Sequence, residues 1–190
     1  MHIWIDIDNS KHILFAKAII TELRSRGHNV TVTAEDNDKI KKELEKNNTS
    51  ASFIGAIVWF FGLFKEEIIM IRALNLKTYL KPRDIDVAFS FGSISAPYTC
   101  IDMNLPIILF LEDLEQKPNI IHFALERSFF IITENIPEQI ILEKGYDLSK
   151  VGRYKGNTKK DDEKPDPKSI KEIVNKIEYL GNHIAGNLKV

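Results

Sequence analysis

The 190-residue sequence has little cysteine and no excess of charge of either sign. Cys100 is the only cysteine, so an intramolecular disulfide bond is excluded and a reducing, cytoplasmic setting is favoured. We expect Cys100 itself to be a small buried residue, as free cysteines usually are. The 26 basic and 27 acidic side chains leave a net charge of −1, without the basic excess typical of nucleic-acid-binding proteins. We therefore predict no nucleic-acid partner.

Three further patterns are missing. The longest apolar run, residues 54–64, has eleven residues, which is well short of the roughly 20 that a membrane-spanning helix needs. No basic segment followed by an apolar segment precedes the first predicted strand, so we expect no secretory signal. His122 and His183 have no partner at a zinc-ligand spacing, and no Gly-x-Gly-x-x-Gly motif is present. The sequence therefore predicts neither a metal site nor a dinucleotide site, and it identifies no cofactor.

Short apolar segments alternate with amphipathic ones along most of the chain. Apolar and β-branched residues predict strands over 2–7, 30–34, 52–56, 86–91, 106–111 and 129–133. Helical spacing predicts helices after the first turn and over 38–46, 66–80, 95–102, 118–126 and 137–144. This alternation is typical of an α/β protein with right-handed crossovers. We predict a single Rossmann-like, doubly wound parallel sheet of about six strands in the order 3-2-1-4-5-6.

The character of the sequence changes near residue 155. Residues 155–168 are polar, charged and interrupted by two prolines, which is typical of a linker. Residues 169–182 then predict a carboxyl-terminal helix with one apolar face, which needs a surface to pack on. We predict a domain over 1–154, a linker over 155–168, and a helix over 169–182 that packs back on the domain.

The turn after the first strand gathers polar side chains, namely Asp6, Asp8, Asn9, Ser10 and His12. In open parallel sheets, ligands bind just outside the carboxyl ends of the strands. Asp8 and His12 are candidate catalytic residues, and Asp6, Asn9 and Ser10 are candidate ligand-binding residues. The alternative is structural: a short polar side chain here caps the following helix and orients the turn.

Further polar residues follow three later strands, namely Gly92, Ser93, Glu112, Asp113 and Glu134. Because carboxyl ends of parallel strands share one edge, we expect them to line the same site as Asp8. Gly92 lets a ligand approach the backbone closely. Such an acidic edge suits a neutral, hydroxyl-rich ligand or a metal better than a bare polyphosphate. Acidic residues at strand ends are also common as solvated structural residues.

The apolar run over Ile54–Phe64 has three open interpretations. Trp59, Phe60 and Phe61 are consecutive, and one face cannot bury them all. The run is a core loop, a subunit interface with a second copy or a partner chain, or a peripheral membrane contact.

Two blocks of residues resemble a known family. Asp6-Ile7-Asp8-Asn9-Ser10 and His12 fit its opening strand and turn, with Lys11 where a proline is common. The helix exit Arg26-Gly27-His28-Asn29-Val30 also fits. Weaker landmarks are Gly92-Ser93, Glu112-Asp113 and 153–156. Over residues 2–157 the chain resembles a largely archaeal domain-of-unknown-function family related to the glycosyltransferase-B and sugar-nucleotide 2-epimerase folds.

The resemblance implies a two-domain enzyme plan from which this sequence departs. In that plan the first domain contacts the acceptor and the second binds the nucleotide-sugar. Here a polar linker and one helix stand where the second domain would begin, and that helix resembles the one that returns to the first domain. The resemblance therefore implies an acceptor-side or assembly module with a sugar or nucleotide-sugar as its ligand. The alternative is a sugar-related enzyme that works with a partner chain or as a homo-oligomer.

Overall fold

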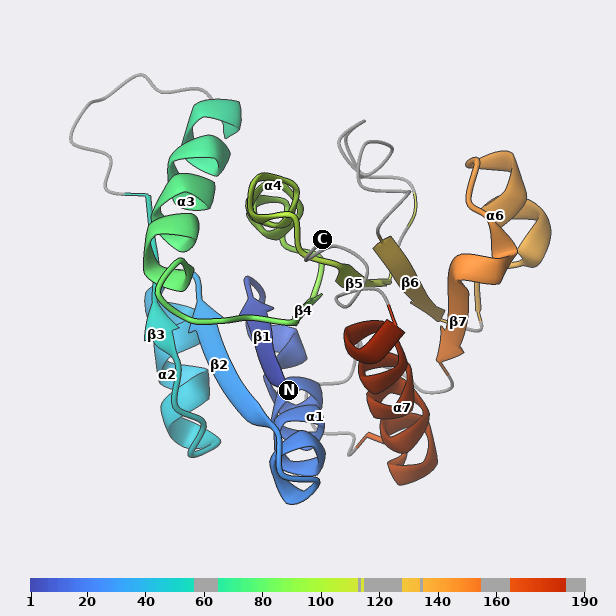
Figure 1. Cartoon of the computed structure of the whole chain (residues 1–190), viewed down its shortest axis with the longest axis horizontal. Coiled ribbons are helices and arrows are strands. Elements are labelled where there is room, and N and C mark those ends of the chain that lie inside the picture. The colour runs from blue at the N-terminus through green and yellow to red at the C-terminus, as the bar shows by residue number, and fades with distance from the viewer. Residues whose placement is uncertain (57–64, 113, 115–127, 134, 155–164, 184–190) are drawn as a thin grey trace.

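A computed structural model describes residues 1–56, 65–112, 114, 128–133, 135–154 and 165–183. Its centre is a seven-stranded, all-parallel sheet in the order β3-β2-β1-β4-β5-β6-β7 (Figure 1). The predicted single Rossmann-like sheet and its strand order are confirmed. A seventh strand extends the sheet beyond the six that the sequence predicts.

The strands are β1 (His2–Ile7), β2 (Asn29–Ala34), β3 (Ser52–Phe53), β4 (Val87–Ser90), β5 (Ile107–Leu111), β6 (Ser128–Thr133) and β7 (Val151–Tyr154). The third strand is shorter than predicted, because only two residues pair with β2. The seventh was not predicted, since Val-Gly-Arg-Tyr lacks the β-branched run that indicates a strand. It pairs in parallel with β6 at the edge of the sheet.

Helices cover both faces of the sheet. The helical elements are η1 (Ser10–His12), α1 (Ile13–Ser25), α2 (Asp38–Lys46), α3 (Lys65–Leu80), α4 (Ser95–Met103), α6 (Glu138–Glu143), η2 (Leu148–Lys150) and α7 (Pro167–His183). Figure 1 shows α3, α4 and α6 on one side of the sheet and α1, α2 and α7 on the other. The helix predicted over 118–126 lies outside the described residues. Most of the predicted linker, residues 155–164, lies outside them as well.

The alternation of β1 divides the core into two layers. Ile3, Ile5 and Ile7 belong to the layer under α1, α2 and α7, whereas Trp4 belongs to the layer under α3, α4 and α6. Successive side chains of a strand point to opposite faces, and this period explains the division. Cys100 is buried in the second layer as predicted, and burial raises the pKa of its thiol well above the ordinary value.

The apolar face of α7 packs against α1 and β4. The predicted apolar positions Ile170, Ile173, Val174, Ile177 and Leu180 are all buried. Beside them, Arg26 Nη1 and His28 Nε2 lie 2.8 Å and 2.7 Å from the two carboxylate oxygens of Glu178. The helix thus lies beside α1 (Figure 1). The division of the chain into domain, linker and returning helix stays a prediction.

Only the start of the apolar run Ile54–Phe64 is described. Ile54 N donates a hydrogen bond to Ala34 O, and this extends the pairing of β3 with β2 by one bond. Residues 57–64 lie outside the described part of the chain, so the three interpretations of the run stay predictions. Among the described helices, none has the length and apolar character that crossing a membrane requires.

Candidate functional site

The strand order reverses between β1 and β4, where ligand crevices form in open α/β sheets. β1 and β4 pair so that Asp6 lies opposite Ser90, with Thr33 opposite Asp6 on the other side. The segments that follow these strands carry Asp8, Asn9, Gly92 and Ser93. The edge at which the sequence predicts a site is therefore the edge that the topology favours.

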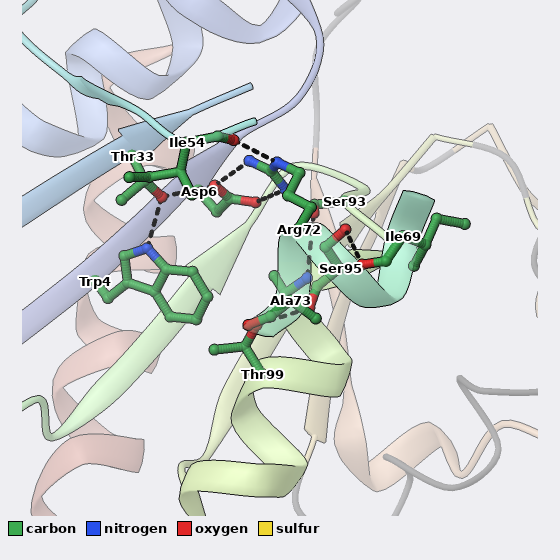
Figure 2. Close-up of polar contacts among 11 residues, drawn as sticks. Trp4, Asp6, Thr33, Ile54, Ile69, Arg72, Ala73, Ser93, Ser95 and Thr99 are labelled. Carbon is green, nitrogen blue, oxygen red and sulfur yellow. Dashed lines mark hydrogen bonds and ion pairs between the residues drawn. The ribbon is translucent and has the colours of Figure 1, made fainter. Parts of the chain in front are cut away.

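The predicted residues divide between the two faces of the sheet. Asp6 points toward α3, because its carboxylate contacts Arg72 of that helix (Figure 2). His12 lies on the opposite side, where its ring is close to Phe91 and Phe110 in the core layer under α1. The site consequently has a buried charged part and an aromatic part.

The Asp6 carboxylate is fully buried and saturated by partners. Arg72 donates from Nη1 to Oδ2 at 2.9 Å and from Nη2 to Oδ1 at 2.8 Å, while Thr33 Oγ1 donates to Oδ1 at 2.6 Å. Trp4 Nε1 donates to Thr33 Oγ1 at 2.8 Å (Figure 2). A paired, two-bond contact of this kind fixes both the charge and the geometry. The predicted ligand role of Asp6 is untested, and the structure gives this carboxylate an internal role.

The charge of Arg72 is held by several carboxylates. Burial works to lower the pKa of its guanidinium, but the charge of Asp6 and the hydrogen bonds to it, together with the charges of Asp8 and Glu35, raise it above the ordinary value. Asp8 therefore lies close enough to act on the same cation. Asp8 is half-buried, in contrast to Asp6.

The turn residues Asn9 and Ser10 form the start of the helical segment. Asn9 Oδ1 accepts a hydrogen bond from Lys11 N at 3.1 Å, and Asn9 is thus the cap of η1. This contact agrees with the capping alternative. Ser10 is the first residue of η1 and is half-buried. Ligand binding by either residue stays a prediction.

His12 lies in an aromatic pocket next to Glu112. Its ring stacks on Phe91 at a centroid distance of 5.5 Å and meets Phe110 edge-on at 5.9 Å. Nε2 lies 3.3 Å from Glu112 Oε1, which is an ion-pair distance, yet neither ring nitrogen has a hydrogen-bond partner. Since His12 is only 5% exposed, these two nitrogens are buried polar atoms without a hydrogen-bond partner.

Gly92 and Ser93 form the turn after β4. Gly92 has a φ of +80°, a left-handed conformation that glycine adopts without strain. Ser93 Oγ accepts from Arg72 Nη1 at 3.1 Å and from Ala96 N at 3.2 Å, at the start of α4. Ser93 is buried, and its two hydrogen bonds hold this turn against Arg72 and α4.

The remaining predicted site residues, Asp113 and Glu134, lie outside the described part of the chain. Across the described residues, no group of three or more histidine, cysteine, aspartate or glutamate side chains is arranged to hold a metal ion.

Arg72, Thr33 and Trp4 were missed by sequence reasoning. Arg72 stands in the apolar segment Ile-Ile-Met-Ile-Arg-Ala-Leu, where a single charge indicates a buried partner. Asp6 is a carboxylate inside an apolar strand, and it carries the complementary signal. Because Asp6 and Arg72 are 66 positions apart in the sequence, their pairing could not be predicted from local patterns.

A neighbouring imidazole and carboxylate can exchange a proton and can bind hydroxyl groups. His12 and Glu112 therefore supply both a donor and acceptors at the edge of the sheet. Both ring nitrogens of His12 are buried and have no hydrogen-bond partner in the described structure. This arrangement suits recognition of a ligand hydroxyl.

Comparison with known proteins identifies a family and a fold. A family described as "Protein of unknown function (DUF354)" matches residues 1–183. No curated protein matches the chain.

Solved structures with a similar fold include a 2-epimerase, a glycosyltransferase and MurG. The UDP-GlcNAc 2-epimerase of Neisseria meningitidis, bound to UDP-GlcNAc, has a TM-score of 0.66 at 14% identity, covering 83% of this chain and 47% of its own. A glycosyltransferase of Rickettsia africae has a TM-score of 0.60 at 14% identity, covering 81% and 42%. MurG of Acinetobacter baumannii has a TM-score of 0.55 at 16% identity, covering 72% and 41%. This chain thus spans less than half the length of each of these three proteins.

Proposed function

This chain belongs to the DUF354 family, and we propose that its described domain is one half of a glycosyltransferase-B-like cleft that binds a hydroxyl-rich ligand. The ligand class is a sugar, either an acceptor or the sugar of a nucleotide-sugar. The fold supports this proposal, because the similar solved structures include a 2-epimerase bound to UDP-GlcNAc. Each of them is at least twice as long as the part that this chain matches.

The observation that carries the proposal is the state of His12. Buried polar atoms in folded proteins almost always have hydrogen-bond partners, and each exception calls for an explanation. Neither ring nitrogen has a hydrogen-bond partner, and Nε2 lies 3.3 Å from Glu112 Oε1. A ligand hydroxyl that bonds to one of these nitrogens would account for this state. Asp8 and Gly92 stand at the ends of the two adjacent strands and complete this wall of the cleft.

The same geometry supports a second candidate function in which the domain takes part in catalysis. His12 would accept the proton of an acceptor hydroxyl while the hydroxyl oxygen attacks the anomeric carbon of the donor and the nucleotide leaves. Glu112, 3.3 Å from Nε2, would stabilise the resulting imidazolium charge. A partner chain or a second copy would then supply the nucleotide-sugar half. The proximity of His12 to a carboxylate at 3.3 Å favours this alternative.

A thermal-shift panel tests ligand binding. We would measure the melting temperature with N-acetylglucosamine, UDP and UDP-GlcNAc, each with and without Mg²⁺. A ligand at ten times its dissociation constant stabilises the folded state by about 1.4 kcal/mol, which corresponds to roughly 3–6 °C for a domain of this size. We expect a shift of this size with at least UDP-GlcNAc, and a flat result across the panel would contradict the proposal.

Variants connect that shift to the site. His12→Phe keeps an aromatic ring between Phe91 and Phe110, so we expect it to fold and to lose the ligand-induced shift. Glu112→Gln should lose most of the shift as well. His183→Gln is the matched control, because His183 is exposed at the end of α7. Release of UDP from UDP-GlcNAc by the chain alone would favour the catalytic candidate.

A further inference from the structure

One buried side chain joins three of the segments that surround the candidate site. Arg72 of α3 is 5% exposed and lies beneath the edge where the strand order reverses. Figure 2 shows its guanidinium pointing toward Asp6, Ile54 and Ser93, which come from three different parts of the chain. Three distinct nitrogen atoms make these contacts.

Each contact fixes one segment. Nη1 and Nη2 hold Asp6, near the end of β1, and thereby the strand that leads into the Asp8–Asn9 turn. Nη1 also donates to Ser93 Oγ at 3.1 Å, in the turn after β4. Nε donates to the carbonyl oxygen of Ile54 at 3.0 Å, directly after β3. The same guanidinium therefore contacts the end of β1 and the segments that follow β3 and β4.

Neighbouring residues of the helices reinforce two of these contacts. Asn75 Nδ2, one turn after Arg72, donates to Gly55 O at 2.9 Å. The hydroxyl of Ser95, two residues after Ser93, donates to Ile69 O on α3 at 3.2 Å. At Gly55, a Cβ atom would lie 2.9 Å from the Cβ of Asp36, so this segment already packs closely. α3 thus holds the segments on both sides of β1.

We infer that Arg72 is a positioning residue that sets the relative places of the Asp8–Asn9 turn, the Ile54–Gly55 segment and the Gly92–Ser93 turn. Its effect on ligand binding rests on the proposed function, whereas its effect on the three segments does not. Arg72 acts on ligand binding through the three segments that it holds in place.

The chemistry of this contact requires arginine. The planar guanidinium binds a carboxylate with two parallel hydrogen bonds and still has donors left for other oxygens, whereas the lysine ammonium is a single compact charge. A buried ion pair often stabilises a fold no more than apolar residues of similar size would. The specific contribution of Arg72 is therefore the geometry of the edge.

Hydrogen exchange of backbone amides tests the positioning role in the full chain. Arg72→Lys keeps the positive charge but loses the two parallel hydrogen bonds to Asp6. Arg72→Met keeps a side chain of similar length but loses the charge. The control is Val174→Ala, which weakens the contact between α7 and α1, far from Arg72 in the fold. Each variant is compared with wild type at a temperature equally far below its own melting point.

We expect both Arg72 variants to exchange about tenfold faster over residues 8–12, 54–56 and 91–96, with α7 unchanged. Val174→Ala should speed exchange in α7 and leave residues 8–12, 54–56 and 91–96 unchanged. Arg72→Lys that matches wild type in all three segments would overturn the inference. Uniformly faster exchange throughout the chain would also overturn it, because Arg72 would then stabilise the fold as a whole.

Binding of UDP-GlcNAc, measured by calorimetry, supplies the second readout. If wild type binds, Arg72→Lys should raise the dissociation constant about tenfold, and Val174→Ala should leave it unchanged. Equal dissociation constants for wild type and Arg72→Lys would overturn the role in ligand binding. If wild type does not bind, the proposed function fails, and the exchange pattern alone decides the positioning role.

Discussion

At the scale of single residues, the candidate site separates side chains that support the edge from side chains that are available to a ligand. Asp6, Thr33 and Ser93 have their polar atoms occupied by Arg72 and by each other. The buried ring nitrogens of His12 have no hydrogen-bond partner, and Nε2 lies 3.3 Å from Glu112 Oε1. The two sets lie on opposite faces of the sheet. A substitution in the first set should affect stability and the placement of the edge, and a substitution at His12 should affect contact with the ligand directly.

Asp6→Asn should be one of the most destabilising single changes in this domain. It removes the charge that compensates the buried Arg72, and breaking one side of a buried ion pair costs about 3–5 kcal/mol in the free energy of unfolding. Asp102→Asn is the matched control, because Asp102 pairs with Lys77 at the surface, where such pairs contribute about 0–1 kcal/mol. Urea unfolding measures both variants. Similar losses in the two would contradict the assignment of Asp6 to a buried network.

Local chemistry at the site was predictable from the sequence, and long-range pairing was not. An Asn before a helical segment predicts a cap, and Asn9 is one. Strand ends predict the shared edge on which Asp8, Gly92 and Glu112 lie. The partner of Asp6 could not be predicted, because Arg72 is 66 positions away and the choice among the basic residues depends on how α3 packs. The residues Phe91 and Phe110 around His12 were missed for the same reason.

At the scale of elements, α7 is the clearest success of sequence reasoning. Its five apolar positions at helical spacing predicted one buried face, and all five are buried. The polar contact beside that face was not predicted, since it depends on how α7 lies against α1 and β2. Arg26 and His28 flank Gly27 and meet Glu178 there. Strand β7 was missed because a short edge strand with glycine and arginine carries little signal.

The contact of Glu178 predicts a pH-dependent contribution to stability. Partial burial works to raise the pKa of this carboxyl, but the hydrogen bond from His28 and the charge of Arg26 hold it below its ordinary value of 4.5. Because the pKa is lower in the folded state, the stabilisation is fully present above pH 4.5 and is lost as the pH falls through the folded-state pKa. The contribution is about 1 kcal/mol, as expected for a partly exposed ion pair.

Urea unfolding of Glu178→Gln as a function of pH checks this prediction. The variant should be less stable than wild type at pH 7, and the difference should close below pH 4.5. Glu172→Gln, an exposed position on the same helix, is the control and should match wild type throughout. A difference that stays constant down to pH 3 would show that the Glu178 carboxylate does not hold α7.

At the scale of the whole molecule, we propose that the domain forms one wall of a cleft. The fold is similar to part of the glycosyltransferase-B and 2-epimerase folds, and the chain spans less than half the length of the three proteins that we compared. The sheet order was predictable, because alternation of strands and helices permits few arrangements. Whether the run Ile54–Phe64 mediates a contact with a second chain depends on residues beyond the described part, so it stays a prediction from sequence.

We propose that the edge between β1 and β4 binds a sugar-type ligand through His12 and Glu112. Amide chemical shifts measured by NMR during a titration with UDP-GlcNAc test it most directly. We predict saturable changes at residues 8–12, 92–93 and 112, and the loss of these changes in His12→Phe. Changes confined to α2 or α7, or no saturable change at any ligand concentration, would contradict the claim.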